Sequence, residues 1–368
     1  MNWLPRLLLA WFDEHGRRDL PWQQDRTPYR VWVSEIMLQQ TQVATVIGYY
    51  ERFMKRFPDV RSLAAAAQDD VLAHWTGLGY YARGRNLHKA AQQVVNEHDG
   101  RFPHGAAALE TLPGIGPSTA GAIAAIAQGE RAAILDGNVK RVLARFHAVD
   151  GYPGNTMVSK RLWHFARYHT PAQRTADYTQ AIMDLGATLC TSRQPRCDHC
   201  PLAARCEARA LDAVANFPGR KPKRAKPERE AYQWLLINDA GACLLRRRPD
   251  RGLWGGLWTP PQSDWPVDQP PPAPEVALAD LLRELNLPAA PASALEALPP
   301  YRHTFTHFHL RLRPFLVSLG SDANTATVSE GVDWTWQHPG ATSDRGLSKP
   351  ALKMLKALQQ PSGRLSFS

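Results

Sequence analysis

The sequence predicts a largely helical N-terminal domain followed by a smaller α/β domain. Apolar residues recur at three- and four-residue spacing almost throughout residues 1–215, which is typical of amphipathic helices. Residues 217–230 are rich in proline and basic residues, as in an extended linker. After this segment, short runs of branched and aromatic residues alternate with turn signals and one helical pattern, which indicates a mixed sheet. A chain of 368 residues is long enough for two or three domains.

Composition and charge narrow the class of protein. The net charge of +10 attracts a polyanion, although simple solubility is an alternative explanation, and a hydrophobic content of 44% allows packed cores. The apolar run Leu7–Phe12 follows Arg6, ends at Asp13 and lacks a small-residue cleavage site. We therefore expect an amphipathic first helix, and neither a signal peptide nor a membrane span.

The segment Leu112–Gly121 reads Leu-Pro-Gly-Ile-Gly-Pro-Ser-Thr-Ala-Gly. Gly114 and Gly116 supply the backbone freedom of a tight turn, and Pro117 suits the first position of a following helix. The pattern predicts a helix, a hairpin and a second helix whose N-terminal amides are exposed. Such a helix end binds a phosphate group without reading sequence. An ordinary helix start after a turn is the alternative.

Four cysteines lie in one loop with the spacing C-x6-C-x2-C-x5-C: Cys190, Cys197, Cys200 and Cys206. Four thiolates from one loop suit a 4Fe-4S cluster, and zinc is the alternative. The spacing differs from the two C-x2-C pairs of most zinc ribbons, which favours iron-sulfur. A disulfide pair is the least expected outcome in a chain with only five cysteines. A thiolate cluster fits a reducing, cytoplasmic compartment.

The hairpin, the segment Ile134–Val142 after it and the cysteine loop together resemble the helix-hairpin-helix DNA glycosylase superfamily. Within that superfamily, the chain resembles the MutY-type adenine DNA glycosylases. The segments Leu20–Trp22, Trp32–Gln42 and Trp75–Arg83 carry this resemblance, which runs from about Trp11 to about Leu355. It implies that the four cysteines hold a 4Fe-4S cluster.

The resemblance also implies an all-α, two-lobed catalytic domain over residues 1–216. Residues 21–130 would form a six-helix lobe that contains the hairpin. Residues 1–20 and 131–216 would form the cluster lobe. The basic linker, residues 217–230, can lie along a phosphate backbone or serve as a solvated spacer.

The C-terminal domain, residues 231–360, resembles a Nudix fold in the order of its elements. We expect a hairpin over Tyr232–Arg247, a helix over Glu275–Asn286, and strands over Phe305–Leu319 and Val332–Gln337. A working Nudix hydrolase needs a helix with several glutamates to hold Mg²⁺. The expected helix lacks that pattern, so we predict a Nudix-like domain that recognises the mismatch and does not hydrolyse nucleotides.

Glu35, Asp136 and Asn138 are the candidate catalytic residues. Glu35 has apolar neighbours on several helix faces, and a desolvated carboxyl group keeps its proton and can act as a general acid. An exposed glutamate on an amphipathic helix is the alternative. By resemblance, Asp136 stabilises an oxocarbenium-like transition state or attacks the sugar carbon, while also being suited to a helix N-cap. Asn138 would orient the sugar or the attacking water.

By resemblance, the DNA-binding residues are Leu38, Gln40, Tyr80, Gly114, Gly116, Ser118 and Lys140. Gln40 and Tyr80 would wedge into the duplex, with Leu38 assisting. Ser118 stands where bifunctional relatives carry a lysine that forms a Schiff base, so we expect base removal without efficient strand scission. Lys140 would contact a phosphate. Weaker candidates for phosphate or pocket contacts are Arg18, Arg83 and Arg85.

Phe305, Thr306 and His307 are the candidates for recognising 8-oxoguanine. This base presents a donor where guanine has a ring acceptor, so a hydroxyl acceptor distinguishes the two. The family commonly has Phe-Ser-His here, and Thr306 keeps the hydroxyl group while adding a methyl group. A zinc site on His303, His307 and His309 is an alternative that lacks a nearby acidic or cysteine partner.

The sequence therefore predicts a monofunctional adenine DNA glycosylase that acts in base excision repair. Its partner would be double-stranded DNA containing adenine opposite 8-oxoguanine or guanine. We expect a monomer in the bacterial cytoplasm, with no membrane partner. The alternatives are a glycosylase/lyase of the endonuclease III type, a Nudix pyrophosphohydrolase, and a non-catalytic iron-sulfur protein that binds DNA.

Overall fold

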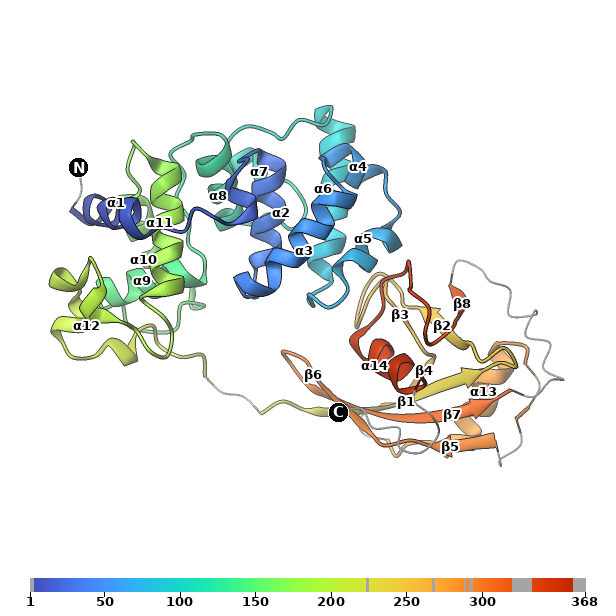
Figure 1. Ribbon diagram of the computed structural model, residues 1–368. Helices are drawn as coiled ribbons and strands as arrows, with labels where there is room; N and C mark the ends of the chain where they lie inside the picture. Colours follow the sequence, from blue (N-terminus) through green and yellow to red (C-terminus); the bar gives the residue numbers. More distant parts are fainter. Residues whose placement is uncertain are drawn as a thin grey trace. The chain divides into compact units, whose positions relative to one another are not determined.

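The chain folds into two compact units, shown in Figure 1. The first comprises Met1–Ala66 with Arg85–Lys223, and the second comprises Ala67–Gly84 with Arg224–Ser368. The computed structural model describes residues 3–222, 225–266, 269–287, 289–290, 294–319 and 333–359. Within these ranges, no helix has the length and apolar character needed to span a membrane.

The first unit is built of helices, and one of them, α6, begins within the second unit. They are α1 (Trp3–His15), η1 (Pro21–Gln23), α2 (Pro28–Leu38), α3 (Val43–Arg56), α4 (Val60–Ala65), α6 (Ala82–His98), α7 (Ala106–Leu109), α8 (Pro117–Ala127), α9 (Gly137–Phe146), α10 (Thr156–His169), α11 (Thr175–Thr188), η2 (Cys197–His199), η3 (Ala203–Arg205), α12 (Glu207–Ala210) and η4 (Val214–Asn216). The side chains of Thr27, Asp59 and Asn155 each accept a hydrogen bond from a first-turn amide of the helix that follows.

The predicted hairpin lies between α7 and α8, and α8 begins at Pro117 as expected. Gly114 has a φ of +78°, and a Cβ atom there would lie 2.7 Å from the Cβ of Asn86. Only glycine satisfies both conditions. Gly116 has a φ of −95°, which any residue adopts, so the turn requires the conformational freedom of glycine at Gly114 alone.

A single apolar core joins α1 to α9, α10 and α11. Its fully buried members include Leu4, Leu8, Leu143, Leu162 and Leu185. Three of the four loop cysteines pack against this core in partly buried positions: Cys190, Cys200 and Cys206. The first helix therefore helps to support the cysteine loop, although the two are about 180 residues apart in the sequence.

The second unit contains an eight-stranded sheet. Its strands are β1 (Glu228–Ile237), β2 (Cys243–Arg247), β3 (Trp258–Thr259), β4 (Gln262–Asp264), β5 (Leu295–Ala297), β6 (Tyr301–Thr304), β7 (His309–Ser318) and β8 (Trp334–Gln337). The main path runs β3-β2-β1-β7-β5, while β4 pairs with β1, β6 with β7 and β8 with β2. The strands β1 and β7 are parallel along their whole length, and the other pairs are antiparallel.

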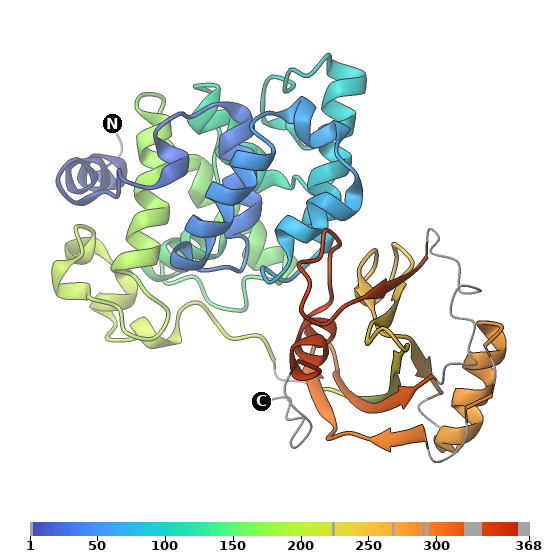
Figure 2. The same ribbon diagram turned by 45° about the vertical axis from the view of Figure 1, so that its right-hand side comes forward.

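Helices cover both faces of this sheet, as Figure 2 shows. Ala231 and Leu235 of β1 pack in the same cluster as residues of α14 (Lys349–Ala357). Tyr232 and Leu236, on the other face of the strand, pack with α13 (Pro274–Glu284). The remaining helix, α5 (Gln68–Trp75), contributes Leu72 to the cluster on the α14 face. The predicted α/β domain is confirmed.

Two details of this domain differ from the sequence prediction. The strand expected from Phe305 begins at His309, because residues 305–308 form a turn closed by a 2.9 Å bond from the Phe305 amide to the Phe308 carbonyl. The strand expected over Val332–Gln337 is β8, Trp334–Gln337, and Val332 lies outside the described residues.

Candidate active site

Glu35 lies on α2, half-buried among buried neighbours on both sides in the sequence. The pKa of its carboxyl group is raised to about 8. Burial is the larger cause, and the negative charge of Asp136 is the smaller one. The two predicted catalytic carboxyl groups thus interact electrostatically, although 101 residues separate them in the sequence. At neutral pH Glu35 keeps its proton, as a general acid must.

Asp136 occupies the N-cap of α9, where its carboxylate accepts a 2.8 Å hydrogen bond from the amide of Val139. Burial raises the pKa of Asp136, while the amides of Val139 and Asn138 stabilise its ionised form. The expected capping role is therefore present. Capping uses the carboxylate as an ionised acceptor, which is also the form that the proposed catalytic role needs, so the two roles are compatible.

Asn138, in the first turn of α9, is held by Arg141. The guanidinium Nη2 of Arg141 donates to the Asn138 side-chain oxygen at 2.8 Å and to the Gly186 carbonyl at 2.6 Å. Its Nε donates to the Cys190 carbonyl at 2.7 Å. A Cβ on Gly186 would lie 2.7 Å from the Asn138 Cβ, so glycine there allows this close approach. With its oxygen engaged, Asn138 presents its amide N–H groups.

A small cavity lies beside Glu35, and sequence reasoning assigned no role to its other walls. They are Trp22, Gln23, Arg26, Val31, Ser34, Ile126 and Gln180. The cavity volume is about 10 Å³, which is room for about one water molecule, so a base enters only if lining side chains move. The Nε2 of Gln23 is buried without a hydrogen-bond partner among the described residues.

The sequence held only a partial signal for this cavity. Trp22 belongs to the Leu-Pro-Trp segment that carries the family resemblance, but nothing in the sequence related it to Glu35. Gln180 lies on α11 and donates to Asp184, which is the i,i+4 pairing of an ordinary helix. Only the packing of α11 near α2 brings it to the cavity wall.

Ser118, in the first turn of α8, has a structural bond. Its hydroxyl oxygen accepts a 3.0 Å hydrogen bond from the amide of Leu135, the residue before Asp136. The hairpin helix is thereby tied to the segment that carries a catalytic candidate. Lys140 is half-buried on α9 and acts electrostatically on Asp136.

The predicted wedge residues have unusual backbones. Gln40 follows the end of α2 with a φ of 57°, and Tyr80 precedes α6 with a φ of 48°. Left-handed conformations at non-glycine residues cost free energy and concentrate at functional sites. Gln40 is exposed, Leu38 is half-buried, and the Tyr80 side chain is 49% exposed. Each has the accessibility that contact with DNA requires.

Thr306 and His307 are exposed at the tip of the β6–β7 hairpin. The ring of Phe305 packs beneath them, with ring centroids 4.8 Å from Phe308 and 4.5 Å from His303. The turn thus has an aromatic base and a polar tip.

Two of the three histidines of this region have other partners. His309 shares a 2.9 Å hydrogen bond with Thr304, and His303 packs against Trp254. No three His, Cys, Asp or Glu side chains of the described ranges converge closely enough to hold one metal ion. The zinc alternative for His303, His307 and His309 therefore has no structural support.

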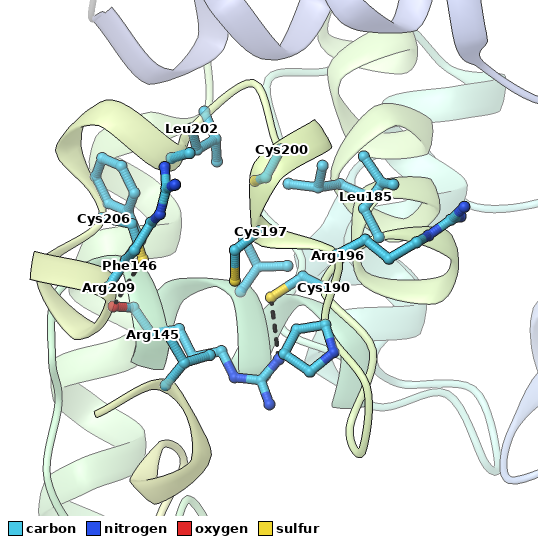
Figure 3. Close-up of a pocket in the computed structure, with 15 residues that line it drawn as sticks. Arg145, Phe146, Leu185, Cys190, Arg196, Cys197, Cys200, Leu202, Cys206 and Arg209 are labelled. Carbon is cyan, nitrogen blue, oxygen red and sulfur yellow. Dashed lines mark hydrogen bonds between the residues drawn. The ribbon is translucent and has the colours of Figure 1, made fainter. Parts of the chain in front are cut away.

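The four loop cysteines line one cavity, shown in Figure 3. Apolar residues such as Leu185 and Leu202 form much of its wall, and Arg145 donates to the Cys190 sulfur at 3.3 Å. Burial raises the pKa of Cys200 to about 11, and negative charge on the other cysteines raises it as well. Four ionised thiolates in this place need a strongly positive partner, and a bound metal centre supplies one.

The chain resembles known repair proteins along nearly all of its length. Residues 33–167 match the family model described as HhH-GPD superfamily base excision DNA repair protein, and residues 232–357 match the NUDIX domain model. The chain is 38% identical to human adenine DNA glycosylase, over 91% of this chain and 71% of the relative. It is 34% identical to adenine DNA glycosylase of Buchnera aphidicola subsp. Schizaphis graminum, over 95% of this chain and 97% of the relative.

A solved structure supports the fold of the helical part. A thermostable thymine-DNA glycosylase is similar with a TM-score of 0.52 and 28% identity, over 56% of this chain and 95% of that one. The predicted fold class, a helix-hairpin-helix glycosylase fold with a C-terminal Nudix-like domain, is confirmed by these matches.

Proposed function

Because the chain belongs to the adenine DNA glycosylases, which are DNA N-glycosylases of base excision repair, we propose that it removes adenine opposite 8-oxoguanine or guanine in duplex DNA. The observations that carry the mechanism are the position of Glu35 at the wall of a small buried cavity and the N-cap position of Asp136, whose negative charge acts on Glu35. One carboxyl group keeps its proton at neutral pH, and the other accepts hydrogen bonds from backbone amides. Burial raises the pKa of both groups, but only Asp136 accepts a hydrogen bond from a helix amide that favours its ionised form, so we assign the acid role to Glu35 and the anion role to Asp136.

In the proposed reaction, Glu35 donates its proton to a nitrogen in the five-membered ring of adenine. The bond between the base and the sugar then breaks, and its electron pair leaves with the protonated base. The sugar becomes cationic, and the Asp136 carboxylate stabilises it or bonds to the sugar carbon. Water supplies the hydroxyl group of the product. Asn138, fixed by Arg141, orients the sugar or the water through its amide.

The cavity beside Glu35 supports a purine pocket once its walls open. Gln23 has a buried amide nitrogen without a hydrogen-bond partner in the described part of the chain, and a ring nitrogen of adenine is a suitable acceptor. Gln180 and Trp22 offer an amide and an aromatic face in the same wall. Such a site binds a base that satisfies its polar groups more tightly than a base that leaves them unpaired.

Two further groups of residues contact DNA in this proposal: the start of α8 with Lys140, and the wedge residues. The amides at the start of α8, after the hairpin, bind a phosphate, and Lys140 contacts another. Gln40 and Tyr80 fill the space left by the extruded base, with Leu38 beside Gln40. Ser118 has no amine and already accepts a bond from a backbone amide, so the enzyme releases the base without breaking the strand.

The C-terminal domain recognises the partner base in this proposal. Thr306 is exposed at a hairpin tip and offers a hydroxyl oxygen to the ring N–H of 8-oxoguanine. Phe305 supports the tip from below, and His307 provides a second polar contact. The helix α13 offers only Glu275, Asp280 and Glu284 as acidic residues, without the several closely spaced glutamates of a working Nudix hydrolase, so we propose recognition without hydrolysis.

We propose that Cys190, Cys197, Cys200 and Cys206 hold a 4Fe-4S cluster. All four line one cavity, and their C-x6-C-x2-C-x5-C spacing differs from the two C-x2-C pairs of most zinc ribbons. When bound, the cluster supplies cross-links that fix the loop. Arg193, Arg196 and Arg205 of that loop would then face the DNA backbone.

Some sequence predictions stay proposals. The catalytic domain spans residues 1–216, with lobes 21–130 and 1–20 plus 131–216. The linker covers residues 217–230 and the recognition domain residues 231–360. We propose that the enzyme acts as a monomer in the cytoplasm.

The experiment that tests the function is single-turnover cleavage of a duplex with adenine opposite 8-oxoguanine, guanine or thymine. Nicking that needs alkali, and that occurs only opposite 8-oxoguanine and guanine, supports the proposal. Nicking without alkali would mean that the enzyme is a lyase. Absence of cleavage by protein whose iron content is complete would favour a DNA-binding protein without activity.

A further inference from the structure

The loop that carries Tyr80 is held in a strained conformation. Three residues in it have positive φ: Gly77 at 101°, Gly79 at 74° and Tyr80 at 48°. A tyrosine with left-handed backbone costs free energy, so the surrounding contacts must favour this shape. The loop connects α5 to α6, and its tip side chain is half exposed.

Arg83, in the first turn of α6, makes most of those contacts. Its guanidinium Nη2 donates to the carbonyl of Leu78 at 3.3 Å and to the carbonyl of Gly79 at 3.2 Å. Its backbone amide donates to the Tyr80 carbonyl at 2.8 Å. The side chain thus satisfies two consecutive carbonyls of the strained loop, and the main chain satisfies the third.

The same guanidinium lies against two aromatic rings. Its central carbon is 5.5 Å from the Trp75 ring and 5.5 Å from the Tyr80 ring. Trp75 is fully buried, and its indole N–H donates to the Gly79 carbonyl at 3.3 Å. The Tyr80 ring is therefore linked to a fixed residue through Arg83, within the distance at which a cation attracts an aromatic face.

Burial supports this arrangement. Desolvation lowers the pKa of Arg83 to about 10, while Tyr80 opposes that shift. The group stays charged at neutral pH, yet it is partly withdrawn from water. A planar guanidinium can stack on rings and donate to carbonyls at the same time, which a lysine ammonium cannot do.

We propose that Arg83 is a positioning residue that preforms the Tyr80 wedge in the DNA-free enzyme, and not a phosphate contact. The inference rests on the proposed function, since it assigns Tyr80 to the space left by the extruded adenine. Arg83 acts only through Tyr80 and its loop. The loop need not order itself when the duplex binds, so binding of the mispair loses less conformational entropy.

A double-mutant cycle tests the proposal. The variants are Arg83→Lys, Tyr80→Ala and the double variant. The matched control is Arg52→Lys, because Arg52 is an exposed residue of α3 whose guanidinium carbon likewise lies near a tyrosine ring, 4.6 Å from that of Tyr49. Each protein is assayed for its Kd with a duplex holding adenine opposite 8-oxoguanine, its single-turnover rate, its Tm and the salt dependence of its Kd.

Arg83→Lys should weaken binding of the mispair or slow excision by about tenfold, the size of a lost stacking contact and a charged hydrogen bond. In the Tyr80→Ala background the same change should have no further effect on Kd or rate. The Arg52→Lys control should leave both unchanged.

Two results would overturn the proposal. If Arg83→Lys costs the same factor with and without Tyr80, and the charge-removing variant Arg83→Gln lowers the salt slope of Kd by about one, then Arg83 contacts a phosphate directly. If it lowers Tm while Kd and rate keep their wild-type values well below Tm, its role is only structural. Failure of wild-type protein to release adenine would refute the proposed function, while the binding cycle would still report on Arg83 and Tyr80.

Discussion

The excision rate should depend on pH through the carboxyl group of Glu35, because only its protonated form can donate to the base. Burial and the charge of Asp136 raise its pKa to about 8. About half of the enzyme would then be active at pH 8 and about one-tenth at pH 9, a tenfold loss per further pH unit. Glu35→Gln should lower the rate by about 10²–10⁴-fold and remove this dependence.

The assay is single-turnover excision of adenine opposite 8-oxoguanine, with enzyme saturating, from about pH 6 to about pH 9. Binding of an uncleavable duplex over the same range separates loss of affinity from loss of chemistry. A rate that already falls about tenfold per pH unit from about pH 6 upward, as for a carboxyl group with the ordinary pKa of 4.5, would show that Glu35 is solvated and would refute the reasoning. A rate for Glu35→Gln close to wild type would refute it as well.

Replacing Asp136 tests what raises the pKa of Glu35. Its charge contributes to the raised pKa of Glu35, but burial is the larger cause. The residual activity of Asp136→Asn should therefore show an inflection below that of the wild type, yet still above 4.5. An unchanged inflection would mean that the two carboxyl groups do not interact.

Three more predictions follow from single contacts. The Nε2 atoms of half-buried His147 and buried His169 lie 2.8 Å apart, and burial is the main cause that lowers the pKa of each to about 4. In the unfolded chain a histidine takes up a proton near pH 6.5, so the folded state has its full stability above that pH. As the pH drops toward 4, the free energy of unfolding should fall by about 3 kcal/mol because of His169, as measured by urea unfolding. His169→Gln should make the free energy of unfolding less dependent on pH over this range. Ser118→Lys should allow strand nicking without alkali, visible on a denaturing gel, and should cost about 1 kcal/mol in urea unfolding through loss of the bond from Leu135. Thr306→Val should reduce the preference for 8-oxoguanine over guanine, in a comparison of Kd, by about tenfold, and equal ratios for variant and wild type would refute its role.

Features that depend on neighbours in the sequence were predictable. Asp136 before a helical pattern indicated an N-cap, and it accepts the amide of Val139. Pro117 begins α8, and Gly114 has the positive φ that a hairpin needs. Each of these signals acts within one turn of the chain, so the local residue types suffice to specify it.

Sheet pairing was less accessible. Alternation in the sequence indicated β1 and β2 as a hairpin, yet their only paired residues are Ile237 and Cys243. The long partner of β1 is β7, which runs parallel to it from Glu228 opposite His309. Parallel pairing between distant segments leaves no turn signal, because its register comes from burying both faces under helices.

The same distinction, between local signals and contacts between distant segments, applies to the chemistry of the site. Motifs around Glu35, Asp136 and the four cysteines, read with the family resemblance, were sufficient to propose an acid, an anion and a metal centre. The pKa of Glu35 was not, because it depends on burial by α8 and α11 and on a charge brought from a distant segment. The position of the Arg83 guanidinium near the rings of Trp75 and Tyr80 was not predictable from the sequence either. Desolvation and ring packing depend on which surfaces exclude water together, and only the folded chain brings those surfaces into contact.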